Sequence, residues 1–232
     1  MRNFSPKFNF KSIDSKAINL IACPDQYVAT YNPGIPANPV SSRTYINIDY
    51  VYSASGKPVC TNLLLDTIVI VLESPHKDEY SYAGGVSTPK GPLVGSWNIF
   101  QLQFHRAIQS SALWTTVSIA KVYNIAFVNA VQYQCSLGKP LSGKNSYANQ
   151  KNLNVKNSWS QAFDVDLEKR LTALQPSLII DLSGKKQEIH NNISFMISNS
   201  SNLKTVPYTF GAHASRWSYL LNRFGSGYTL IN

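Results

Sequence analysis

Three short apolar runs constrain this chain most, because each ends close to a polar side chain of a chemically active type. The runs comprise residues 67–72, 124–128 and 205–210. They lead to Glu73, Asn129 and His213, respectively. Short, β-branched apolar runs are typical of strands buried on both faces of a parallel sheet. Because open α/β sheets bind ligands beyond the carboxyl ends of their strands, we expect a carboxylate, an amide and an imidazole at one site.

From residue 63 onward, strand-like and helix-like patterns alternate. Strand patterns occupy residues 67–72, 122–131, 177–182 and 203–210, and helical spacing occupies residues 97–111, 160–174, 183–198 and 216–224. This alternation predicts an α/β fold, a three-layer α/β/α sandwich with a central, mostly parallel four-stranded sheet. We expect residues 63–232 to form this domain and residues 1–62 to be an N-terminal extension packed on it. The Gly/Pro-rich residues 83–95 are expected to form a loop.

The charge of the chain is strongly basic and unevenly distributed. The formal net charge is +9, and no acidic residue occurs between Glu79 and Asp164 or after Glu188. A surface of this kind suits a polyanion, of which nucleic acid is the commonest. A basic protein that is merely soluble is the alternative reading.

Several classes of protein are disfavoured by the composition. No apolar run reaches the roughly 18 residues that a membrane helix needs, and no apolar segment follows the basic N-terminus as in a secretory signal. The three cysteines are widely spaced, with no Cys-x-x-Cys pair, which argues against disulfides and against a zinc or iron–sulfur site. We therefore expect a cytoplasmic monomer with no metal, no cofactor and no membrane association.

Five short stretches stand at the expected strand ends and helix starts. They are Leu-Glu-Ser-Pro-His-Lys-Asp-Glu at 72–79, Gly-Pro-Leu-Val-Gly at 91–95, Asn-Ala-Val-Gln-Tyr at 129–133, Pro-Ser-Leu-Ile-Ile-Asp-Leu-Ser-Gly at 176–184 and His-Ala-Ser at 213–215. Their order resembles that of the uracil-DNA glycosylase superfamily, closest to its iron–sulfur branch. The resemblance covers residues 67–220. The chain departs from it at Leu93, where the family has a stacking Phe, at His76 for Gly and at Ala214 for Pro. It also lacks the cluster cysteines.

The resemblance implies cleavage of an N-glycosidic bond in DNA without a cofactor, by three catalytic residues. Glu73 would stabilise the cationic sugar or position water, as carboxylates do in glycoside hydrolysis. His213 would stabilise the departing base, and Asn129, which offers both a donor and an acceptor, would read it. The alternatives for these three are a capping or ion-paired glutamate, a surface-loop histidine and an amide that caps a strand end. Asp78 and Glu79 compete with Glu73, and His76 with His213.

The remaining site residues follow from the same resemblance. The base pocket is expected to comprise Ser74, Pro75, His76, Leu93 and Asn129. Because a base inside a duplex is unreachable, the enzyme would flip it out. DNA contacts are expected from Lys144, Ser183, Lys185, Ser215 and Arg216, whereas Trp217 is expected to be a core residue and His105 and His190 to be structural.

The altered pocket favours a pyrimidine-type base that is uracil, mismatched, damaged or bulkily modified, in single- or double-stranded DNA. The biological setting would be DNA repair or defence against phage with modified DNA. Two other readings stay open. One is a non-catalytic DNA-binding module on the same fold. The other is a small-nucleotide hydrolase or flavodoxin-like domain, although neither a Gly-x-Gly-x-x-Gly nor a Walker-type loop is present.

Overall fold

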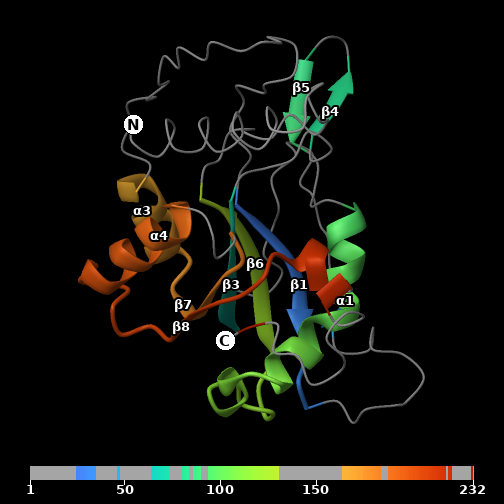
Figure 1. Cartoon of the computed structure of the whole chain (residues 1–232), viewed down its shortest axis with the longest axis vertical. Helices are drawn as coiled ribbons and strands as arrows, with labels where there is room; N and C mark the ends of the chain where they lie inside the picture. Colours follow the sequence, from blue (N-terminus) through green and yellow to red (C-terminus); the bar gives the residue numbers. More distant parts are fainter. Residues whose placement is uncertain are drawn as a thin grey trace.

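A computed structural model gives the fold of the chain (Figure 1). It describes residues 25–34, 46–47, 64–73, 80–83, 86–89, 94–130, 164–183, 188–217, 219–220 and 231. The main feature is a six-stranded mixed sheet with the strand order β2-β1-β6-β3-β7-β8. Helices lie on both faces of this sheet, so the predicted α/β class is confirmed.

Four neighbouring strands of the sheet are parallel to one another. They are β6 (Tyr123–Asn129), β3 (Asp66–Leu72), β7 (Pro176–Asp181) and β8 (Tyr208–Phe210). Every residue of β6 is buried, as are the five central residues of β3. Their continuous apolar sequences therefore correspond to strands covered on both faces.

The sheet is larger than the sequence predicted, and it is mixed because two antiparallel strands extend one side of it. The strand β1 (Gln26–Tyr31) pairs antiparallel with β6, and β2 (Ile46–Asn47) pairs antiparallel with β1. The expectation of four strands was wrong because β6, buried along its whole length, has a second hydrogen-bonding edge that β1 satisfies. Both added strands come from residues 1–62.

Alternate residues of the central strands face two separate apolar clusters. On one face, Ile68 and Ile70 of β3 pack with Phe100 and Phe104 of α1 (Val94–Gln109). On the other face, the core joins β3 to α3 (Asp164–Ala173) and α4 (Glu188–Asn199). This arrangement follows from the two-residue period of a strand, which sends successive side chains to opposite faces. Figure 1 shows α1 on one side of the sheet and α3 and α4 on the other.

Three segments differ in kind from the sequence-based expectation, beyond shifts of a few residues at the other boundaries. The predicted strand over 203–210 is mostly turn, and only its last three residues form β8. The predicted loop over 83–95 contains part of a hairpin, formed by β4 (Tyr80–Ala83) and β5 (Val86–Pro89). The predicted closing helix begins as a short 3-10 turn at Ala214–Arg216, and most of its remainder lies outside the described residues.

The chain changes direction sharply between α3 and β7. Gln175 adopts a positive φ of 46°, the left-handed conformation that favours glycine at the end of a helix. Pro176 follows and opens β7, since proline lacks the amide hydrogen that would continue the helix. None of the helices within the described residues combines the length and apolar character needed to cross a bilayer.

Candidate functional site

The strand register brings Glu73 and Asn129 to the same point on the sheet. Leu72, the last residue of β3, pairs with Asn129, the last residue of β6. The next amide, Ala130 N–H, donates to the Leu72 carbonyl at 2.7 Å. Glu73 and Asn129 are 6% and 5% exposed, respectively. Two of the three predicted catalytic residues are therefore buried neighbours at the carboxyl edge.

Asn129 carries a buried polar atom without a hydrogen bond. Ile125 and Phe127 belong to the cluster on the α1 face, so the two-residue period assigns Asn129 to that face as well. Its Oδ1 has no hydrogen-bond partner within the part of the chain that the structure describes. An unsatisfied buried acceptor costs about 1–3 kcal/mol, so the fold tolerates a penalty that a bound donor would remove.

A second such atom lies at the end of the adjacent strand β7. Leu182 N–H donates to the Val71 carbonyl at 2.8 Å and extends the β3–β7 pairing. Ser183, predicted to bind DNA, is buried and donates its backbone N–H to Asp181 Oδ1 at 2.8 Å. Its own Oγ has no partner among the residues that the structure describes. The Thr172 hydroxyl on α3 likewise has no partner among the described residues.

His213 reaches the same edge from the next strand. Gly211 N–H donates to the Asp181 carbonyl, so the chain leaves β8 beside the end of β7. The following turn is anchored by Trp217, which is fully buried and donates its indole N–H to the Ala212 carbonyl at 2.7 Å. His213 is half-buried in this turn. It shares the carboxyl edge with Glu73, but the strand β7 lies between their strands.

Two neighbours of His213 match their expected environments. Trp217 belongs to the core, as predicted, and stacks on Phe100 with ring centroids 5.8 Å apart. Arg216 is exposed at the end of the turn. Its position leaves the guanidinium accessible to a charged partner.

Arg170 of α3 holds the end of β6, which the sequence did not suggest. Its Nη2 donates to the carbonyls of Asn129 and Ala130 at 3.0 and 3.3 Å. Its Nη1 lies 2.6 Å from Asp25, just before β1, and its Nε lies 2.8 Å from Asp166. The guanidinium thus ties three segments together behind the candidate site. In the sequence, only the i,i+4 spacing of Asp166 and Arg170 indicated one of these contacts.

A second unforeseen group joins β7, β8 and α4. Asp181 Oδ2 accepts from Tyr208 OH at 3.2 Å and lies 2.7 Å from His190 Nδ1. Burial and the Asp181 carboxylate raise the pKa of Tyr208, so its hydroxyl stays protonated. The His190 ring packs on Phe210, with centroids 4.7 Å apart. The strand-end rule that selected Glu73 and Asn129 would also have selected Asp181, the last residue of β7.

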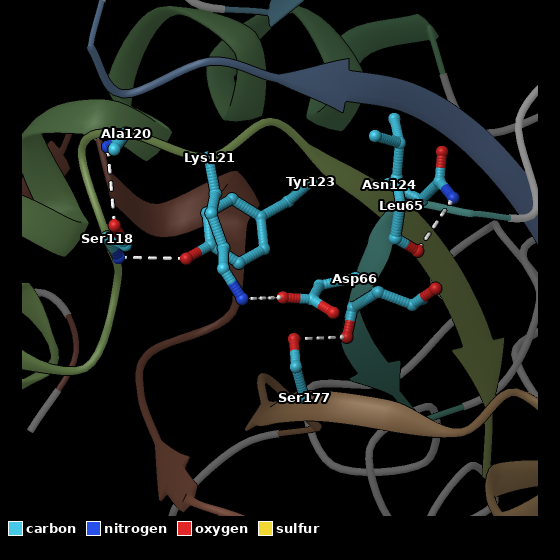
Figure 2. Close-up of polar contacts among 9 residues, drawn as sticks. Leu65, Asp66, Ser118, Ala120, Lys121, Tyr123, Asn124 and Ser177 are labelled. Atoms are coloured by element: carbon cyan, nitrogen blue, oxygen red, sulfur yellow. Dashed lines mark hydrogen bonds and ion pairs between the residues drawn. The ribbon is translucent and has the colours of Figure 1, made fainter.

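The opposite, amino edge of the sheet has a different character (Figure 2). There Lys121 Nζ pairs with Asp66 at 2.7 Å, which raises the pKa of Lys121. Asn124 and Ser177 each donate from their side chains to a backbone carbonyl of the β3 segment. These polar side chains have defined partners, an opposite charge for Lys121 and Asp66 and a backbone carbonyl for Asn124 and Ser177, whereas Asn129 and Ser183 at the carboxyl edge keep atoms with no partner among the described residues.

The rest of the predicted site cannot be placed. Ser74, Pro75, His76, Leu93, Lys144 and Lys185 lie outside the described residues, as do Asp78 and Glu79. Ser215 is described only in its backbone.

Metal binding has no support in the described part of the chain, where no group of three His, Cys, Asp or Glu side chains is placed to hold an ion. Comparisons of the chain with family models, curated proteins and solved structures gave no match. The functional argument therefore depends on the chemistry of the carboxyl edge.

Proposed function

We propose that this protein is a DNA glycosylase that flips out a pyrimidine-type base and hydrolyses its N-glycosidic bond, leaving an abasic site. The observation that carries the proposal is the register of β3 and β6, in which Glu73 follows directly after Leu72, the partner of Asn129, while Asn129 Oδ1 has no hydrogen-bond partner among the described residues. A carboxylate and an unsatisfied amide at one edge of the sheet suit a ligand that has both a cationic sugar and a hydrogen-bonding edge. The basic charge of +9 suits a DNA substrate.

Each residue has a distinct role in the proposed reaction. Glu73 stabilises positive charge on the sugar and orients the attacking water. Asn129 Oδ1 accepts a hydrogen bond from the base, which gives the buried amide its missing partner. His213 donates to the base as negative charge develops on it. Arg216, exposed next to His213, contacts a phosphate or fills the gap left in the stack.

The fold in this proposal corresponds to the three-layer sandwich of the uracil-DNA glycosylase superfamily, with two antiparallel strands added at one edge. The enzyme acts as a monomer in the cytoplasm, on uracil or on a mismatched, damaged or bulkily modified pyrimidine. Its role is repair or defence against phage with modified DNA.

The test is base release from oligonucleotides that carry a panel of such pyrimidines, in single and double strands, read by alkaline cleavage at abasic sites. We expect Glu73→Gln and His213→Ala to lower the release rate about 10²- to 10³-fold and to retain DNA affinity. Asn191→Ala is a matched control for Asn129→Ala, because Asn191 is an exposed amide on α4.

If the protein binds these oligonucleotides tightly but releases no base from any of them, the enzyme proposal is wrong. A non-catalytic DNA-binding module then accounts for the basic charge.

A further inference from the structure

We infer that Leu72 is a specificity residue of this site, and that the base it contacts is a pyrimidine with an apolar substituent at C5. This inference rests on the proposed glycosylase function and narrows its substrate class. The observation behind it is that Leu72 and Asn129, the last residues of β3 and β6, pair with each other. Leu72 was not among the site residues expected from the sequence.

The side chains of Leu72 and Asn129 belong to the same face of the sheet. Neighbouring strands lie about 4.7–4.9 Å apart, so paired residues are direct neighbours. Leu72 packs against the cluster on the α1 face, which also contains Ile70 and Phe127, the pair two residues earlier. Because side chains alternate along a strand, the Asn129 amide stands beside the Leu72 side chain on that face.

The other neighbour of Leu72 along this row is apolar as well. Asp181 pairs with Val71, so Leu182, one residue later, lies opposite Leu72 on β7's side. Leu182 belongs to the α1-face cluster and is fully buried. Asn129 is therefore the polar end of a row that continues with two leucines, at the carboxyl edge of three adjacent strands.

Leu72 keeps part of its surface accessible, unlike the residues that precede it on the same face. Ile68 and Ile70 are 0% exposed, whereas Leu72 is only partly buried. The apolar cover on this face is therefore incomplete at the last residue of the strand. A ligand that hydrogen-bonds to the Asn129 amide at this edge meets the accessible part of Leu72 as well.

A pyrimidine carries a matching pair of groups on its ring. An N–H at N3 or on a 4-amino group can donate to Asn129 Oδ1, which has no hydrogen-bond partner among the described residues. C5 is bonded to C4 and is where thymine carries its methyl group, a group that proteins contact with apolar side chains. A C5 alkyl group against Leu72 removes apolar surface from water, whereas a C5 hydroxymethyl group would lose the hydration of its hydroxyl there.

The experiment compares release of thymine with uracil, and of 5-methylcytosine with cytosine, from otherwise identical oligonucleotides. For wild type we expect kcat/KM to be about 10- to 100-fold higher for the methylated base of a pair, and the pair that is released identifies the 4-substituent. The 5-hydroxymethyl analogue should be released more slowly than the methylated base.

Three variants assign this preference to Leu72. Leu72→Ala is expected to lose most of it, and Leu72→Met, which conserves the side-chain volume, is expected to keep it. Leu64→Ala is the matched control, because Leu64 lies two residues before β3 and is 95% exposed. We expect it to match wild type on every substrate.

The ratio of two substrates guards against a variant that folds poorly. Loss of folded protein lowers the release of both bases by the same factor and leaves their ratio unchanged. The inference is overturned, with the glycosylase proposal left standing, if wild type releases the unmethylated or hydroxymethylated base at least as fast as the methylated one. A Leu72→Ala variant that keeps the wild-type ratio has the same consequence. Absence of release by wild type from every substrate overturns both.

Discussion

Arg170 makes the sharpest prediction about what holds the candidate site together. Its guanidinium contacts Asp25 at 2.6 Å, Asp166 at 2.8 Å and two carbonyls at the end of β6. Arg170→Met keeps much of the aliphatic stem and removes all four contacts. The change leaves the Asp25 carboxylate, only 16% exposed, without this counter-charge.

The magnitude follows from the burial of each partner. Removing one member of a buried ion pair costs about 3–5 kcal/mol, and the partial exposure of both side chains puts this pair at the lower end. The Asp166 contact adds little, since that side chain is 46% exposed and such i,i+4 pairs contribute about 0.3–0.5 kcal/mol. We therefore expect a loss of about 3 kcal/mol, or about 6–12 °C in Tm for a chain of this size.

Urea unfolding of wild type, Arg170→Met, Asp25→Asn and the double variant measures the loss and isolates the pair. Lys169→Met is the matched control, because Lys169 is the exposed neighbour on the same helix, and it is expected to stay within about 0.5 kcal/mol of wild type. If Arg170→Met loses less than about 1 kcal/mol, or if the cycle shows no coupling to Asp25, the reasoning is refuted.

Three further predictions concern single positions. Burial lowers the pKa of His105 below 6.5, so the unfolded chain is protonated first as the pH falls. The free energy of unfolding should therefore decrease below about pH 6.5, by at most about 1.4 kcal/mol per pH unit from this group. Urea unfolding at pH 7.5 and 5 should show a smaller pH-dependent loss of stability for His105→Gln than for wild type. Asn129→Ala should change the free energy of unfolding by less than about 1 kcal/mol, because it removes an unsatisfied acceptor. The rate of base release should nevertheless fall. A large loss of stability would show that Asn129 is structural. Gln175→Gly should stabilise the fold by up to about 1 kcal/mol, since φ is 46° there, and an unchanged or lower Tm would contradict this.

The sequence contained enough local information to locate the central strands and helices. The run at 67–72 coincides with β3 apart from its first residue, and the helix expected at 97–111 overlaps α1, which begins three residues earlier. These elements were predictable because hydrophobic period and β-branching are properties of neighbouring residues. The strand-end rule likewise identified Glu73 and Asn129, which follow or end the paired strands β3 and β6 at the same edge of the sheet.

Only the tertiary structure decided which distant residues meet. β1 joins the sheet because β6 has an open edge, and no pattern within residues 26–31 specifies that partner. The contact of Arg170 with Asp25 spans 145 positions, and His190 is brought to Asp181 only by the packing of α4 on the sheet. Hydrogen bonds and ion pairs act over a few ångströms in space, so the partners of a side chain depend on the topology of the fold. The sequence pattern shows which chemical groups the chain has, but it does not show which of them become neighbours.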